Sequence, residues 1–178
     1  NFLKLSQGFT YYEYDNKNTN KTLVFIHGYS VPSYIWDSAY NSALEKGYRT
    51  VRLDLYGRGY SSNLDVDYTD DLFANQVIEL LKELKIEKAT LIGLSNGGRV
   101  ISKIAFIKPE IVNELIYVSS SSFLEHNPPK DKSVSGKEIN DFIKNRYPTI
   151  SNSQLLDFKY PEKFVGWDTK YENLLKYE

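Results

Sequence analysis

The sequence predicts one α/β domain built around a mostly parallel sheet, with helices on both faces of the sheet. First, apolar runs typical of strands alternate with helical patterns from residue 8 to residue 122. Second, the run over 22–26 is apolar almost without a break, as in strands that are buried on both faces. Third, a serine flanked by glycines, Gly93-Leu94-Ser95-Asn96-Gly97, stands where a strand pattern gives way to a helical pattern.

Three strands and one helix are expected in the first part of the chain. Residues 8–14 are rich in aromatic and β-branched side chains, which favour a strand. The run over 22–26 predicts a central strand. A helix is predicted from Ser33, as its N-cap, to Lys46, because Gly47 follows as a stop signal. Residues 49–55 then predict the third strand.

The next part of the chain predicts two more helices and two more strands. A helix over 70–84 places its apolar residues on one face, with charges opposite. These residues are Leu72, Phe73, Val77, Leu80, Leu81 and Leu84. The strand over 89–94 leads into the serine turn. A helix over 97–107 follows and ends before Pro109. Residues 114–119 predict the last clear strand.

The pattern changes after residue 122. A loop rich in proline, lysine and serine covers 126–136, and Ser135 is placed to cap a helix over 137–146. We therefore divide the chain into a core part, 1–122, and a helical cap or lid insertion, 123–178, that folds over the carboxyl edge of the sheet. A plain helical tail is the alternative for the second part.

Composition excludes several classes of function. The 178 residues carry a net charge of −1 with interspersed charges, which argues against nucleic acid as a partner. No apolar run approaches the ~20 residues of a membrane span, and no signal-peptide pattern opens the chain, so we expect a cytoplasmic protein. With 0 cysteines, disulfides, thiolate metal sites and a cysteine nucleophile are excluded. No metal and no organic cofactor is expected.

Three loops should meet at one edge of the predicted sheet, because the carboxyl ends of parallel strands lie together there. They are residues 27–36, 55–62 and 93–98. Ser95 is the candidate nucleophile on a strained turn between strand and helix. The N–H of Asn96 lies at a helix start, which favours negative charge, and the N–H of Tyr29 is the second candidate donor to an oxyanion.

Three segments resemble the signature segments of the α/β-hydrolase superfamily, in its cap-containing, esterase-like branch. They are Leu23-Val24-Phe25-Ile26-His27-Gly28, Asp54-Leu55-Tyr56-Gly57-Arg58-Gly59-Tyr60-Ser61 and Gly93-Leu94-Ser95-Asn96-Gly97-Gly98. The resemblance covers residues 8–122 and implies a three-layer α/β-hydrolase fold, incomplete in this chain, with a cap inserted after residue 119. A serine in place of an aspartate at position 95 argues against the chemistry of haloalkane dehalogenases and epoxide hydrolases.

Other residues of these loops are expected to bind substrate or to support the site. Gly28, Tyr29 and Trp36 are candidate substrate-binding residues, although aromatic residues at such spacings are more often part of a core. His27 is expected to organise the oxyanion loop rather than to act as a base. His126 lies in a polar loop, where a catalytic role is disfavoured. Asp54 and Arg58 are expected to fix their own loop.

The resemblance also implies a triad acid and a histidine after the cap, and neither is in this chain. Without an imidazole near its hydroxyl, Ser95 is a poor nucleophile. We therefore expect that the chain alone is inactive and that it is part of a longer hydrolase, whose remaining C-terminal part is a separate segment or chain. A protein that is itself non-catalytic and a substitute role for His126 are the alternatives.

These observations predict a serine hydrolase that acts on a small-molecule carboxylic ester or a related acyl substrate. A carbon–carbon bond hydrolase or a perhydrolase of the same fold is an alternative within the family. A non-catalytic small-ligand binding protein with the same fold is the alternative from another class.

Overall fold

The computed structural model describes residues 1–17, 19 and 21–120. These residues belong to the first of the two units into which the chain divides, Asn1–Phe123. The predicted cap, the helix over 137–146 and His126 lie outside the described residues, so the interpretation of 123–178 as a cap remains a prediction.

The sheet has six strands in the order β1-β2-β4-β3-β5-β6. The strands are β1 (Phe2–Lys4), β2 (Phe9–Asp15), β3 (Thr22–Ile26), β4 (Arg49–Leu53), β5 (Ala89–Leu94) and β6 (Val112–Val118). The four strands from β4 to β6 are parallel to one another, and β1 and β2 extend the sheet in antiparallel pairing. The predicted α/β architecture with a mostly parallel sheet is thus confirmed.

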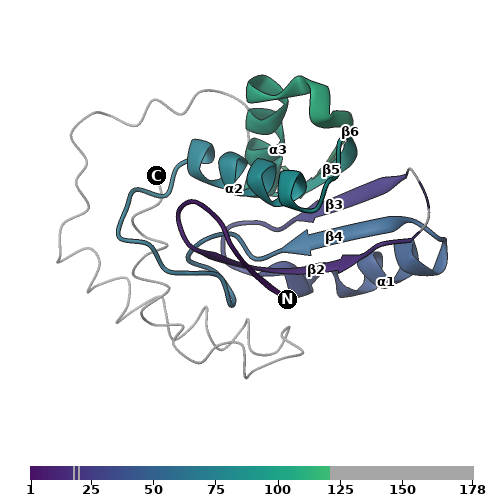
Figure 1. Cartoon of the computed structure of the whole chain (residues 1–178), viewed down its shortest axis with the longest axis horizontal. Coiled ribbons are helices and arrows are strands. Elements are labelled where there is room, and N and C mark those ends of the chain that lie inside the picture. The colour runs from purple at the N-terminus through teal and green to yellow at the C-terminus, as the bar shows by residue number, and fades with distance from the viewer. Residues whose placement is uncertain (18, 20, 121–178) are drawn as a thin grey trace. The chain divides into compact units, whose positions relative to one another are not determined.

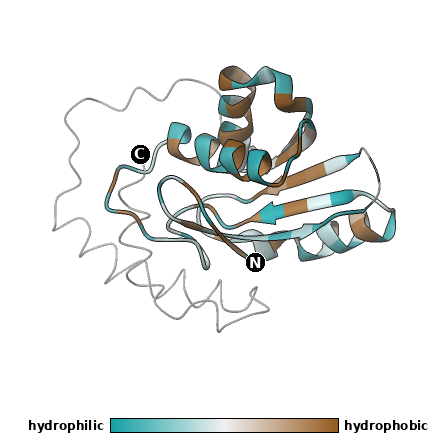
Figure 2. Cartoon of the chain, in the orientation of Figure 1, coloured by the Kyte–Doolittle hydropathy of each residue, from teal (hydrophilic) through white to brown (hydrophobic). Residues whose placement is uncertain are grey.

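Helices cover both faces of this sheet. Helix α1 (Asp37–Glu45) lies on one face, and helices α2 (Asp70–Glu83) and α3 (Asn96–Ile107) lie together on the other (Figure 1). Short 3₁₀ helices, η1 (Ser33–Trp36) and η2 (Pro109–Ile111), precede α1 and β6. Hydrophilic and hydrophobic residues alternate around the helices, as expected where one side of a helix packs on a sheet (Figure 2).

The strand alternation divides the core into two layers. On the α1 side, Phe25 and Ile92 pack with Trp36, Tyr40 and Ala43. On the α2 and α3 side, the strands and the helices contribute side chains that are fully buried. These are Val24, Ile26, Val77, Leu80, Leu91, Ile101 and Ile104. Because both faces of β3 and β5 are buried, the apolar run predicted for a central strand is explained.

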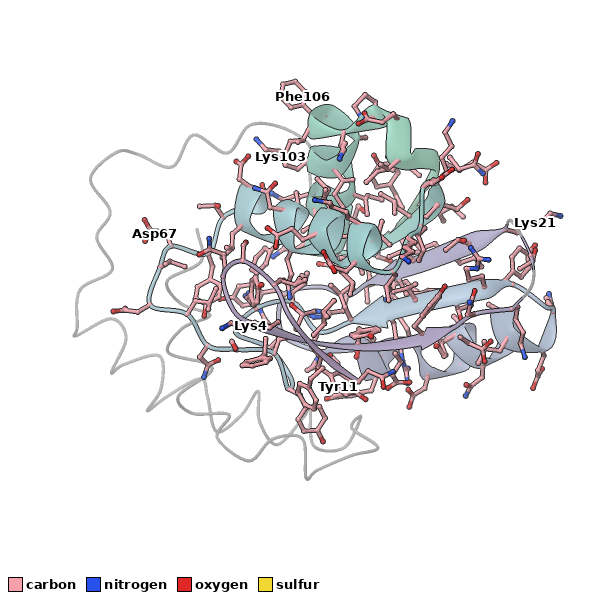
Figure 3. The ribbon with its side chains drawn as sticks, in the orientation of Figure 1. Lys4, Tyr11, Lys21, Asp67, Lys103 and Phe106 are labelled. Carbon is pink, nitrogen blue, oxygen red and sulfur yellow. The ribbon has the colours of Figure 1, made fainter. Side chains whose placement is uncertain are left out.

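Ion pairs join α2 to α3 at the carboxyl end of the sheet. Arg99 donates from Nε and Nη2 to one carboxylate oxygen of Asp70, at 3.0 and 2.7 Å. The Lys103 ammonium lies 3.0 Å from Asp71, and Phe106, with 81% of its surface exposed, projects from the same helix (Figure 3). None of the helices in the described part of the chain is long and apolar enough to cross a membrane.

The structure differs from the sequence-based expectation at β1 and at the helix expected over 33–46. Strand β1 was not predicted, because three residues are too few to form a recognisable pattern. The helix expected over 33–46 is divided into η1 and α1, and Ser33 is the first residue of η1 rather than an N-cap. The Ser33 N–H donates to the Asp54 carboxylate at 2.8 Å, a long-range contact that the local sequence does not reveal.

Candidate active site

Ser95 lies on a strained turn between β5 and α3. Its backbone has φ 51° and ψ −119°, a conformation that costs a residue with a side chain roughly 1–3 kcal/mol. The turn is held by a hydrogen bond from the Ser95 N–H to the Val118 carbonyl, 3.0 Å, and by one from Gly98 N–H to the Ser95 carbonyl, 2.9 Å. Ser95 itself is half-buried. This is the backbone geometry expected of a nucleophile elbow.

Two glycines permit the turn because backbone atoms approach them closely. A Cβ on Gly93 would collide with the Gly97 carbonyl. A Cβ on Gly97 would lie 2.5 Å from the Ile26 carbonyl oxygen and 2.7 Å from that of His27. The elbow is therefore packed directly against the end of β3, and no larger residue fits at either position without a backbone shift.

The loop after β3 lies beside Ser95. A Cβ on Gly28 would lie 3.2 Å from the Ser95 Cβ and 3.8 Å from its Oγ. Tyr29 follows in the same loop and is partly buried, and Asn96 is the first residue of α3. The structure thus brings Gly28 and Ser95 into contact, with Tyr29 and Asn96 as their chain neighbours. Backbone N–H groups at the first turn of a helix favour negative charge.

His27 is a buried structural residue in this arrangement. Its Nε2 accepts a hydrogen bond from the Leu55 N–H at 2.9 Å, so its Nδ1 carries the proton and donates to the Gly28 carbonyl at 2.7 Å. Burial lowers the pKa of the ring from its usual value of 6.5 to about 4. With both nitrogens engaged and the ring neutral, His27 links two loops and is not available as a base.

The loop after β4 holds the first loop through buried polar side chains. Asp54 accepts hydrogen bonds from Ser33 N–H at 2.8 Å and from Tyr60 N–H at 2.9 Å. Arg58 donates from Nε to the Tyr29 carbonyl at 3.1 Å. Burial raises the pKa of the Tyr29 phenol, against the opposing charge of Arg58. These contacts are consistent with the expectation that Asp54 and Arg58 fix their loop.

Gln76 is a supporting residue that the sequence interpretation missed. It is 2% exposed on α2 and donates to Thr10 Oγ1 at 2.9 Å and to the Asp54 carbonyl at 3.1 Å. Its Oε1 accepts from Tyr56 N–H at 2.9 Å. A polar residue next to Val77 on the apolar face of the predicted helix was the signal that could have identified it.

Trp36 lies in the core layer under α1, packed with Phe25 and Tyr40. It is 8% exposed, and its ring centroid lies 5.4 Å from that of Phe25. Trp36 thus packs in the core, and its contact with substrate stays a prediction. The direction of a side chain in the segment before α1 depends on how the helix packs, which the local pattern does not reveal.

The described residues place the candidate nucleophile, Ser95, on its turn beside the loop that carries Gly28. His27, the one histidine among them, is engaged on both ring nitrogens. Within this part of the chain, no group of three or more His, Asp or Glu side chains is arranged to hold a metal ion. A serine on such a turn, beside backbone N–H groups, fits covalent chemistry at a carbonyl carbon.

Comparison with known proteins identifies relatives of the chain. A family model described as the alpha/beta hydrolase fold matches residues 21–178. An uncharacterized hydrolase of Bacillus subtilis is 30% identical over 121 residues, covering 67% of this chain and 44% of that protein. A pimeloyl-(acyl-carrier protein) methyl ester esterase of Aliivibrio fischeri is 33% identical over 99 residues, covering 56% of this chain and 36% of that protein.

A solved structure supports the same relationship. A carboxylesterase of the ammonia-oxidizing thaumarchaeon Nitrososphaera gargenis superposes with a TM-score of 0.64 at 31% identity, covering 68% of this chain and 46% of that chain. The chain spans less than half of the length of the curated relatives it matches.

Proposed function

The chain belongs to the alpha/beta hydrolase fold family, and from that premise we propose that the whole protein is a serine hydrolase acting on a carboxylic ester or a related acyl substrate. The observation that carries the proposal is the strained Ser95 turn between β5 and α3, with Gly28 packed against it. The relatives named as esterases support an ester as the substrate class.

In the proposed reaction, the Ser95 Oγ attacks the acyl carbonyl carbon while its proton passes to a histidine outside the described residues. The carbonyl oxygen becomes an oxyanion, which the N–H groups of Tyr29 and Asn96 bind. Each such donor is worth roughly 3 kcal/mol of the barrier. The C–O bond to the alcohol then breaks, the alcohol leaves with the proton, and water releases the acid by the same steps in reverse.

Fluorophosphonate labelling of the whole protein tests this proposal. We expect an adduct that the Ser95→Ala variant does not form. Ser102→Ala is the matched control, because Ser102 is a half-buried serine on α3 whose Oγ is hydrogen-bonded to the Gly98 carbonyl at 2.8 Å. This control should label at the wild-type rate. A well-folded protein without a Ser95-dependent adduct would contradict the proposal and favour a role in ligand binding.

A further inference from the structure

We propose that Arg58 is a positioning residue of the oxyanion hole, which holds the Tyr29 carbonyl and so, together with the hydrogen bond of His27 to the Gly28 carbonyl, keeps the Tyr29 N–H in one direction. The inference rests on the proposed function, in which that N–H binds the oxyanion. Arg58 does not touch the reacting atoms. It acts through the backbone of the loop beside Ser95.

The contacts of Arg58 are those of a clamp rather than of a surface charge. The side chain is 2% exposed, and it donates from Nε to the Tyr29 carbonyl at 3.1 Å and from Nη1 to the Tyr56 carbonyl at 3.0 Å. Its guanidinium carbon lies 5.6, 5.5 and 4.9 Å from the ring centroids of Tyr29, Tyr68 and Phe73. A planar guanidinium stacked on aromatic faces is restricted in orientation, so its hydrogen bonds have fixed directions.

A second anchor holds the peptide on the other side of Tyr29. The Gly28 carbonyl accepts a hydrogen bond from His27 Nδ1 at 2.7 Å. Because a trans peptide is planar, the Gly28 carbonyl and the Tyr29 N–H point in opposite directions, and fixing one fixes the other. Arg58 fixes the following peptide through its carbonyl. His27 thus holds the peptide before Tyr29, and Arg58 holds the peptide after it. The Tyr29 N–H therefore keeps one direction before substrate binds.

The loop that carries Arg58 is itself held in place. The Tyr68 hydroxyl, whose ring lies beside the guanidinium, accepts from Leu64 N–H at 2.8 Å and donates to the Leu64 carbonyl at 3.2 Å. Asp54 accepts from Tyr60 N–H at 2.9 Å. The position of Arg58 is therefore set by contacts within its own loop, so Arg58 can restrain the Tyr29 carbonyl. Preorganised donors are what an oxyanion hole requires.

The experiment compares Arg58→Gln and Arg58→Lys in the whole protein with Arg52→Lys as the matched control. Arg52 is also buried, at 8% exposed, and lies over an aromatic ring, but it pairs with Glu13 and Asp37. The readouts are kcat and KM for p-nitrophenyl acetate, the fluorophosphonate labelling rate and hydrogen exchange at the Tyr29 amide. All assays are run well below each variant's measured Tm.

Arg58→Gln is expected to lower kcat by about 10- to 100-fold with KM nearly unchanged, because only the transition state carries the oxyanion. Arg58→Lys should recover part of the loss, since an ammonium supplies a donor without the planar fork. The Tyr29 amide should exchange faster in Arg58→Gln and at the wild-type rate in Arg52→Lys.

Wild-type kcat in Arg58→Gln, or an equal loss in Arg52→Lys, would overturn the inference while leaving Ser95 as the nucleophile. If the wild-type protein forms no Ser95-dependent adduct, the proposed function fails, and the exchange measurement alone decides the positioning. Unchanged Tyr29 exchange in Arg58→Gln then overturns it, and faster exchange supports it.

Discussion

Among single residues, His27 shows how the site constrains a titratable group. Its ring joins the end of β3 to the loop after β4 through hydrogen bonds of 2.7 and 2.9 Å to the Gly28 carbonyl and the Leu55 N–H. Nε2 must remain unprotonated to accept the second of these bonds. The architecture of the loops therefore selects the neutral ring, and burial lowers its pKa to about 4.

This depressed pKa predicts that stability falls in acid. The unfolded chain protonates His27 below about pH 6.5, whereas the folded chain does so only near pH 4. The contribution of His27 is therefore complete above pH 6.5 and is lost as the pH falls toward 4, by up to about 3 kcal/mol. Denaturant unfolding of wild type and His27→Gln across this range measures it. The variant should be less stable at neutral pH and should show a shallower decline, and an identical slope in both proteins would contradict the assignment.

Gly97 predicts a second residue-scale effect, on stability and on labelling together. An added Cβ would meet the carbonyl oxygens of Ile26 and His27 at 2.5 and 2.7 Å, and backbone atoms cannot move aside as a flexible side chain can. We expect Gly97→Ala to cost about 2–4 kcal/mol and to slow fluorophosphonate labelling at Ser95.

Gly47→Ala is the matched control for this substitution. Gly47 has open space around it and a φ of +81°, so its cost should be only that of the left-handed backbone, about 1–2 kcal/mol, without an effect on labelling. Unfolding in denaturant and labelling rates of the two variants make the comparison. Equal costs with equal labelling would contradict the close packing of the elbow against β3.

At the scale of elements, helix α2 connects local sequence to the site. Thr69 caps its start, because Oγ1 accepts from Leu72 N–H at 3.1 Å, and two aspartates occupy the first turn. Such a cap satisfies one of the otherwise unpaired N–H groups of a helix start. The helix presents Gln76, which is hydrogen-bonded to the Asp54 carbonyl and so braces the loop that carries Arg58.

Loss of this cap predicts a measurable destabilisation. Thr69→Ala should cost about 1 kcal/mol of unfolding free energy, while Thr69→Ser, which keeps the hydroxyl, should cost only a few tenths. Denaturant titration of both variants at neutral pH measures the difference. A serine variant as unstable as the alanine variant would show that the threonine methyl, and not the hydrogen bond, supports the helix.

The sequence predicts some elements better than others. An element that depends on its own residues and their sequence neighbours can be predicted, whereas one that depends on contacts with distant parts of the chain cannot. Strand β3 has the predicted bounds, 22–26, because a central strand that is buried on both faces consists almost entirely of apolar residues. Ser95 was placed on its turn because the glycines that permit the turn are its neighbours. The local sequence could not predict on which side of the sheet Trp36 packs or which residues Gln76 forms hydrogen bonds with. Both depend on contacts between residues that are far apart in the chain.

For the whole molecule, the parallel strands gather the three predicted loops at one edge. In Figure 3, Lys21 stands before β3, at the amino end of the sheet, while Asp67 lies in the loop between β4 and α2, beyond the carboxyl ends. That edge holds Ser95 and the loop of Gly28 and Tyr29. Under the proposed function, His27 is not the proton acceptor at this edge, because both of its ring nitrogens are already hydrogen-bonded.

The engagement of His27 leads to a prediction about which part of the protein has Ser95-dependent activity. The sequence contains 2 histidines, His27 and His126. Because His27 cannot accept a proton from Ser95, residues 1–178 alone should hydrolyse p-nitrophenyl acetate no faster than the same polypeptide with Ser95→Ala. The whole protein carrying His126→Gln should keep its wild-type kcat if a histidine beyond residue 178 is the base. Turnover by residues 1–178 that disappears both in Ser95→Ala and in His126→Gln would contradict this prediction and would assign the role of the base to His126.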